Sequence, residues 1–195
     1  YERCASRTQK KDQSDVARLA KKVSKTKVPK LIDATGKDRT KAILIISEGD
    51  SSSGKIVEAR DPDIHGILPL RGKLLNVNGV HPKVALENKV LQDIMNALGL
   101  VIGKKADISQ MNYGKLWVAA DADEDGKNIS ALVINFIYTF WPELFQDNKK
   151  TFLHLYQTPL IIARKGKETK YWYAENYDEF DSTKYGKSKG WAVTR

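Results

Sequence analysis

Apolar and polar positions divide the chain into a polar, basic start and a longer part with regular apolar segments. Residues 1–40 offer few apolar positions, so we expect an extension outside the main core, with a helix over about 15–25 capped by Ser14. From residue 41 short continuous apolar runs alternate with helical patterns. The runs at 41–47 and 115–121 are typical of strands buried on both faces.

This alternation predicts an α/β fold, a mostly parallel sheet with helices on both faces. Pro69 restricts the strand at 65–70 to an edge or to a strand end. The other expected elements are helices over 51–60, over 83–98 up to a cap at Gly99, and over 129–145 in the interior, and strands over 152–163 and 169–173 that bracket a hairpin at Lys165-Gly166-Lys167. We therefore expect a basic helical or linker extension over 1–40 and one α/β domain over 41–195.

Charge is concentrated at the start of the chain. Residues 1–41 carry 13 Lys or Arg against 5 Asp or Glu, whereas the other 154 residues carry 20 against 19. A polyanion, most simply nucleic acid, would explain this basic segment, and a solvated linker or helix is the alternative. The single cysteine, Cys4, excludes an internal disulfide and a multi-thiolate zinc site. No apolar run approaches the ~20 residues that span a bilayer, so we expect no membrane segment.

Two acidic clusters follow the two buried strands. Glu48-Gly-Asp-Ser51 comes after the first strand, and Asp121-Ala-Asp-Glu-Asp-Gly126 comes after the second. In parallel sheets the carboxyl ends of strands meet at one edge, so these carboxylates are brought together and need a positive partner. Mg²⁺ prefers oxygen ligands and would fit. Asp121, Asp123 and Asp125 would turn to one side if the strand continued, with Gly126 releasing the chain into a helix. The alternative is an acidic, solvated turn.

Two known motifs match in part. Asp121-x-Asp-x-Asp-Gly126 begins like an EF-hand, but Leu132 stands at the twelfth position and a strand precedes it. Gly49 to Lys55 has the G-x-x-x-x-G-K spacing of a P-loop after a strand, but Ile56 replaces the Ser or Thr that binds Mg²⁺. The EF-hand is excluded, and a P-loop NTPase stays an alternative.

A third stretch, Pro69 to Val77, carries donors for phosphate. Arg71 and Lys73 flank a glycine that lets a ligand approach the backbone, and Asn76 adds a neutral donor and acceptor. By itself this pattern is also common in surface turns.

Together the three stretches resemble the toprim region of type IIA DNA topoisomerases, the family of gyrase and eukaryotic topoisomerase II, from about residue 28 to the end. The resemblance implies a toprim fold and a Mg²⁺ site, with two metal ions, that acts on the DNA backbone. It implies Glu48, Asp121 and Asp123 as metal ligands, with Asp125 supporting them and Glu48 also the catalytic acid or base. It further implies Lys73 and Asn76 as DNA contacts, with Arg71 at a position that is basic in relatives. Glu124 stands where the family usually has His, which suggests a divergent, viral or phage member.

The resemblance also implies a fragment of an enzyme that cleaves double-stranded DNA, passes a second duplex through the break with ATP, and religates it. The ATPase site and the nucleophilic tyrosine would lie outside this chain, the tyrosine in a winged-helix domain of the same or a partner subunit. The full enzyme would be a dimer or heterotetramer inside the cell, nuclear in a eukaryote and cytoplasmic in a bacterium or a phage host. We expect the isolated chain to be inactive. The other alternative is a toprim-like DNA-binding module without catalysis.

Overall fold

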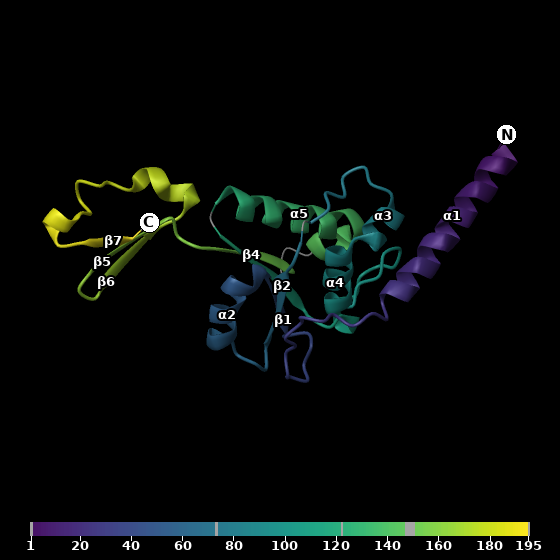
Figure 1. Ribbon diagram of the computed structural model, residues 1–195, viewed down its shortest axis with the longest axis horizontal. Coiled ribbons are helices and arrows are strands. Elements are labelled where there is room, and N and C mark those ends of the chain that lie inside the picture. Colours follow the sequence, from purple (N-terminus) through teal and green to yellow (C-terminus); the bar gives the residue numbers. More distant parts are fainter. Residues whose placement is uncertain (1, 73, 122, 147–150, 195) are drawn as a thin grey trace.

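The centre of the molecule is a parallel sheet of four strands. A computed structural model describes residues 2–72, 74–121, 123–146 and 151–194. The sheet has the order β2-β1-β3-β4, and every neighbouring pair is parallel, as predicted (Figure 1). Its strands are β1 (Ile43–Glu48), β2 (His65–Leu70), β3 (Lys115–Ala120) and β4 (Leu153–Gln157).

Helices cover both faces of this sheet. The helix α2 (Gly49–Ala59) packs on one face, while α3 (Pro82–Glu87), α4 (Lys89–Leu98) and α5 (Glu124–Phe140) belong to the layer on the other, and α2 and α5 lie on opposite sides of the strands in Figure 1. Alternate residues of each strand supply the two cores. Within the part of the chain that the structure describes, no helix has the length and apolarity needed to cross a membrane. Short 3₁₀ helices span Ile108–Gln110, Pro142–Phe145, Ala174–Glu179 and Lys187–Lys189.

Local sequence signals set several of these boundaries. Pro69 lies in β2, which is an edge strand of the sheet, as predicted. Gly99 ends α4 in the left-handed conformation, at φ 79°, which confirms the predicted cap. The single helix expected over 83–98 is wrong, because Asn88 leaves the helical conformation and its side chain accepts the Leu91 N–H as the N-cap of α4.

The helix expected at 129–145 differs from α5 in extent and in burial. It begins five residues earlier, at Glu124, and ends at Phe140. Val133 and Phe136 are buried, but Tyr138 is 58% exposed. The prediction of an interior helix is therefore wrong, because α5 forms an outer layer with one apolar face on the sheet.

A second, smaller sheet follows β4. Its strands β5 (Ile161–Lys165), β6 (Glu168–Trp172) and β7 (Ala192–Thr194) are antiparallel, in the order β6-β5-β7. Gly166 turns the predicted hairpin at φ 58°. The strand expected over 152–163 is in fact two strands, β4 in the large sheet and β5 in the small one. Figure 1 shows the small sheet apart from the large one, and Trp172 and Trp191 are buried in its own core. The single domain over 41–195 stays a prediction.

The N-terminal segment packs on the sheet domain more than we expected. The helix α1 (Glu2–Val23) passes through Ser14, whose hydroxyl donates to the Lys11 carbonyl at 2.7 Å and so does not cap a helix start. Ala20 and Val23 are buried in the main core, which corrects the expectation that residues 1–40 lie outside it. The cause is the apolar side of the last turns of α1, which faces the body of the domain.

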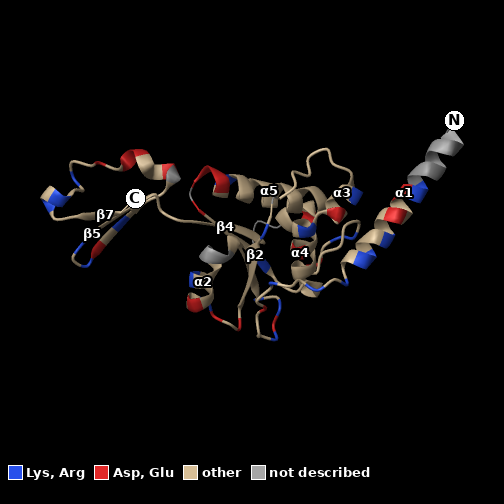
Figure 2. Ribbon diagram, viewed as in Figure 1, with Lys and Arg blue, Asp and Glu red and all other residues tan. Residues whose placement is uncertain are grey.

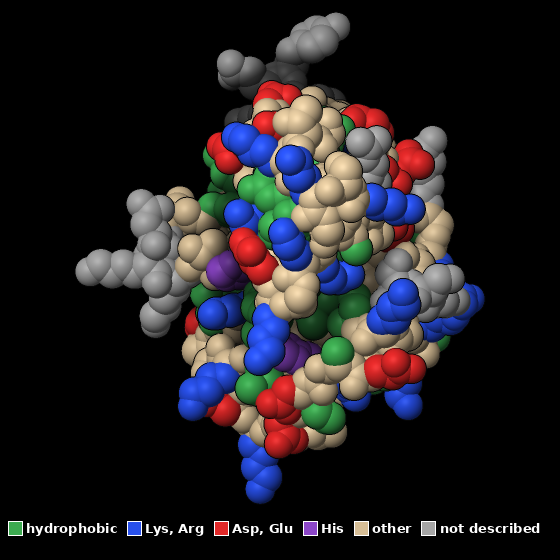
Figure 3. Space-filling view, turned by 90° about the vertical axis from the view of Figure 1, so that its left-hand side faces the viewer, with side chains coloured by type: hydrophobic (Ala, Val, Ile, Leu, Met, Phe, Trp, Pro, Cys, Tyr) green, Lys and Arg blue, Asp and Glu red, His purple; other side chains and the backbone are tan. Residues whose placement is uncertain are grey.

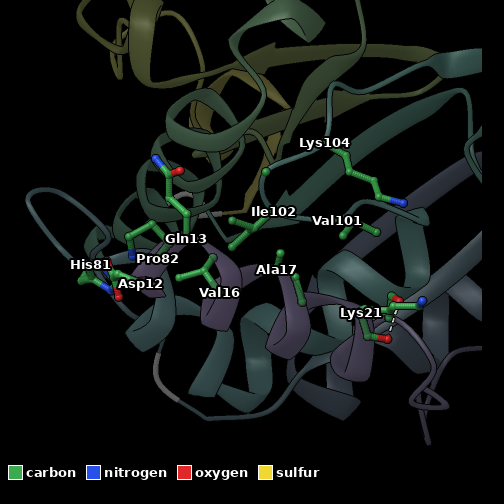
Figure 4. A pocket seen from close by; sticks show the side chains of 13 residues that line it. Asp12, Gln13, Val16, Ala17, Lys21, His81, Pro82, Val101, Ile102 and Lys104 are labelled. Carbon is green, nitrogen blue, oxygen red and sulfur yellow. Dashed lines mark hydrogen bonds and ion pairs between the residues drawn. The ribbon is translucent and has the colours of Figure 1, made fainter. Parts of the chain in front are cut away.

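Two contacts show how this segment is fastened. Figure 4 shows Val16 and Ala17 of α1 across a groove from Val101 and Ile102, and the groove has a volume of about 800 Å³. At one end of the groove the His81 Nε2 atom lies 2.8 Å from the Asp12 carboxylate. The groove is therefore the seam along which α1 meets the domain.

Further along, residues 30–40 are locked to the amino ends of the strands. Tyr113 is fully buried, and its hydroxyl donates to the Asp33 carboxylate, which also takes two hydrogen bonds from Arg39, at 3.0 and 3.2 Å. Burial and the Asp33 hydrogen bond raise the pKa of Tyr113 above its usual value, so the hydroxyl stays a donor. A Cβ at Gly66 would lie 2.1 Å from that hydroxyl, so only glycine fits there.

Candidate metal and DNA site

The carboxyl ends of three neighbouring strands bring the predicted site residues to one edge of the sheet. Glu48 ends β1 and is paired in register with Leu70 of β2, so Arg71 follows next to it. On the other side Ser47 is paired with Ala119 of β3, and the acidic loop from Asp121 begins two residues later. Figure 2 shows the acidic residues gathered where β3 passes into α5. The two acidic clusters therefore meet, as their positions after buried strands predicted.

Glu48 is the most constrained carboxylate of the site. It is half-buried, and it accepts a hydrogen bond from the backbone N–H of Asp121. Its Oε2 atom is buried and has no hydrogen-bond partner. Burial raises the pKa of Glu48, and the negative charges of Asp123, Asp121 and Asp125 raise it further, although the hydrogen bond from Asp121 opposes this. An unsatisfied carboxylate oxygen among other negative groups is poised for a positive partner.

The three aspartates do not line up as a continued strand. The strand β3 ends at Ala120, and Asp123 is the N-cap of α5, its carboxylate accepting the Gly126 N–H at 2.8 Å. Asp125 lies in the first turn of the helix, and all three aspartates are exposed. The predicted strand-like alternation is wrong, because the negative charge of an N-cap and first turn favours the start of a helix there. Gly126 lies inside this helix rather than before it.

A backbone contact holds this loop against the helix. A Cβ at Gly126 would lie 2.1 Å from the Asp121 carbonyl oxygen and 2.8 Å from its nitrogen. The absence of a side chain at Gly126 therefore allows the first turn of α5 to rest on Asp121, which fixes the backbone N–H that reaches Glu48.

These residues fit a hard divalent cation that is not yet fully enclosed. Across the described residues, no three His, Cys, Asp or Glu side chains are close enough together to hold a metal ion. The unpartnered Glu48 oxygen nevertheless faces a concentration of negative charge, and the aspartates are exposed and so free to rotate toward an ion. Glu124 is 93% exposed and pairs with Lys127 at 3.1 Å.

The loop after β2 presents the predicted basic residues. Leu74 and Val77 are buried and anchor it, while Arg71 and Asn76 are exposed. Lys73 lies outside the described residues. The Asn76 side-chain oxygen accepts hydrogen bonds from the Asn78 N–H and from the Asn135 side chain of α5, each at 3.1 Å. The groups that Asn76 can offer a ligand are therefore its amide N–H donors.

Asn135 has no role that the sequence could have indicated, since it lies 59 residues beyond Asn76 and only the packing of α5 brings it there. Charge alone does not single out this loop either. Figure 3 shows Lys and Arg side chains spread among acidic ones over the face that it displays.

The P-loop alternative is not compatible with the backbone. A P-loop needs an irregular, glycine-rich turn whose N–H groups surround phosphate. Here α2 begins at Gly49, so the stretch up to Lys55 is helical, and the Ser53 hydroxyl donates back to the Gly49 carbonyl at 3.1 Å. Most of its N–H groups are used within the helix, and this alternative is wrong.

Comparisons with known proteins agree with this geometry. The family model described as Toprim domain matches residues 43–155. DNA topoisomerase 2 top-2 of Caenorhabditis elegans is 44% identical over 168 residues, covering 77% of this chain and 11% of that protein. A protein of the type 2 topoisomerase from Aquifex aeolicus is 34% identical over 165 residues, covering 80% of this chain and 20% of that protein.

A solved structure is similar as well. The DNA-binding, cleavage and re-ligation domain of Plasmodium falciparum topoisomerase II matches with a TM-score of 0.74 and 33% identity, over 86% of this chain and 24% of that one. The chain thus spans only 11% and 20% of the lengths of the two relatives compared by sequence. Its fold, its acidic edge and these matches together show that the chain belongs to the Toprim domain family, as the toprim region of a type IIA DNA topoisomerase.

Proposed function

We propose that this chain binds Mg²⁺ and DNA and supports the cleavage and religation of double-stranded DNA within a larger, ATP-dependent topoisomerase. Glu48, Asp121 and Asp123 hold two metal ions, and Asp125 supports them. Arg71, Lys73 and Asn76 hold the DNA beside them.

One observation carries this proposal. The Glu48 side chain reaches across from β1 to the Asp121 backbone on β3, and its second oxygen is buried without a partner among three aspartates. Carboxylates on two rigid strand ends would otherwise only repel each other. A bound cation satisfies the Glu48 oxygen and neutralises the aspartates at the same time.

The chemistry divides between the acidic edge and the basic loop. The metal, when bound, stabilises the charge that develops on the attacked phosphate and on the departing 3′ oxygen. Glu48 has a raised pKa, which suits a group that passes a proton to or from the DNA hydroxyl. Arg71 and the amide donors of Asn76 lie at the same edge and fix the phosphate backbone there.

The rest of the reaction belongs to the larger protein. We propose a winged-helix domain, in the same or a partner subunit, as the source of the nucleophilic tyrosine, and a separate domain as the site of ATP hydrolysis. The assembled enzyme is a dimer or heterotetramer, and it works where the cell keeps its DNA.

Metal binding is tested on this chain by calorimetry with MgCl₂. Glu48→Gln and Asp121→Asn should each weaken Mg²⁺ binding at least tenfold, because each removes a charged ligand. Asp178→Asn is the matched control, since Asp178 is an exposed carboxylate of the C-terminal part of the chain. Equal Mg²⁺ affinity for Asp121→Asn and the control would contradict the metal assignment.

Catalysis is tested in the full-length enzyme that carries this segment. Asp121→Ala or Asp123→Ala should abolish DNA cleavage while DNA binding survives. Cleavage that persists would sink the proposed mechanism. Normal metal and DNA binding by the wild-type chain, with no cleavage by the full-length protein, would identify the alternative, a toprim-like module without catalysis.

A further inference from the structure

A hollow lies beside the acidic edge, on the side away from Arg71. It has a volume of about 440 Å³ and opens between α2 and the end of β4. Asp121 forms part of its wall, so it is continuous with the candidate metal site. No residue that the proposed function uses as a DNA contact lines it.

The lining combines one cation with a mixed surface. Lys55 of α2 projects from one side, and Tyr156 and Thr158 come from the end of β4. Lys55 is exposed, and no carboxylate of the described residues forms an ion pair with it. Tyr156 is 59% exposed although it is aromatic. The floor is apolar, formed by Ile56 and Ala119.

The order of the strands places this hollow opposite the basic loop. Along the carboxyl edge the order is Arg71 after β2, Glu48 on β1, Asp121 after β3, and Thr158 after β4. Three strand spacings separate the two ends, about 14 Å. At 3.4 Å per nucleotide along the helix axis, this is roughly four nucleotides of one DNA strand.

From this arrangement we infer that Lys55, Tyr156 and Thr158 form a second DNA contact, which holds the strand on the β4 side of the metal site. Lys55 binds a backbone phosphate, Thr158 donates to the same phosphate group, and the Tyr156 ring covers the neighbouring sugar. The inference rests on the proposed function, because it needs a DNA strand at the acidic edge.

Holding the strand on both sides of the carboxylates has a physical purpose. The acidic edge repels phosphate wherever its charge is not neutralised, and a strand fixed on one side only can swing away from it. A contact on each side limits the position of the phosphate between them, and positioning of this kind is a large part of catalysis. Lys55 is the lysine of the rejected P-loop match, and this assigns it a different phosphate.

The experiment measures binding of this chain to a fluorescent nicked DNA duplex by anisotropy, in Mg²⁺, over a series of salt concentrations. Lys55→Ala should weaken binding roughly threefold to tenfold and lower the slope of log affinity against log salt by about 0.9, because one phosphate contact is lost. Lys55→Arg should restore both. Tyr156→Ala should weaken binding roughly fivefold at an unchanged slope, because the lost contact is apolar.

Lys115→Ala is the matched control. Lys115 is an exposed lysine at the amino end of β3, on the opposite edge of the same sheet, so its loss should leave affinity and slope unchanged. All four variants replace exposed side chains, and their thermal unfolding should match that of the wild type.

The outcomes separate this inference from the proposed function. If the wild-type chain does not bind DNA, the proposed function itself fails. If the wild type binds and Arg71→Ala weakens it, but Lys55→Ala behaves like Lys115→Ala, only the second contact is refuted. If Lys55→Ala leaves DNA affinity unchanged and tightens Mg²⁺ binding, Lys55 merely offsets the charge of Asp121, and the inference is also overturned.

Discussion

Replacing Gly126 with alanine tests whether close backbone contact builds the acidic site. Gly126 is in the first turn of α5, and its new Cβ would lie 2.1 Å from the Asp121 carbonyl oxygen, whereas real Cβ contacts are essentially never under 3.0 Å. The loop or the helix therefore has to move by about 1 Å. Overpacking of this kind costs about 1–3 kcal/mol, which opposes a gain of about 1 kcal/mol from replacing glycine in a helix.

Gly54→Ala is the control that isolates the clash. Gly54 also lies within a helix, α2, but a Cβ there would meet nothing within 4 Å. Only the helix-propensity gain of about 1 kcal/mol remains, so this variant should unfold about 2–4 °C above the wild type. The two variants should therefore differ in the free energy of unfolding by about 1–3 kcal/mol.

Chemical and thermal unfolding measure this difference, and calorimetry with MgCl₂ follows the site. Gly126→Ala should also bind Mg²⁺ more weakly than Gly54→Ala, because the displaced Asp121 backbone no longer meets Glu48 in the same place. Equal stabilisation of both variants, with equal Mg²⁺ affinity, would refute the reasoning.

Two further predictions concern buried polar groups. Tyr113→Phe should lower the free energy of unfolding by about 1.5–3 kcal/mol at pH 7, because it removes a hydrogen bond to a charged group. Burial raises the pKa of Asp33, but the hydrogen bonds from Tyr113 and Arg39 outweigh it and leave that pKa below its usual value. This stabilisation is present above the unfolded pKa of about 3.9 and is lost as the pH falls through the folded value, so unfolding curves of the variant and the wild type should converge in acid; a gap that persists there would contradict the assignment. Glu48→Gln should raise the melting temperature in EDTA, because a raised carboxyl pKa means that the ionised form destabilises the fold and that stability increases as the pH falls through this pKa. It should also abolish the stabilisation by Mg²⁺, and a lower melting temperature in EDTA would show that the Glu48 charge is already satisfied.

The parallel sheet and the meeting of the two acidic clusters follow from local patterns. The apolar runs before Glu48 and Asp121 predicted two strands buried on both faces, and strands of that kind place their carboxyl ends at one edge. Pro69 and Gly99 were informative for the same reason, since each restricts its own backbone whatever surrounds it.

The predictions that failed depended on contacts between distant residues. The exposed outer face of α5, the burial of Ala20 and Val23 and the separate small sheet depend on which surfaces meet, and an apolar pattern does not name its partner.

For this protein the sequence by itself determined the α/β order, the strand ends and the residue types available for metal and phosphate. Only the tertiary structure decided that Glu48 bonds to the Asp121 backbone, that Asn135 positions Asn76, and that Lys55 lines a hollow next to Asp121. The physical reason is range. Backbone preference and periodicity act over a few residues, whereas a site is assembled from side chains tens of residues apart, whose distances are fixed only when the whole sheet and its helices pack.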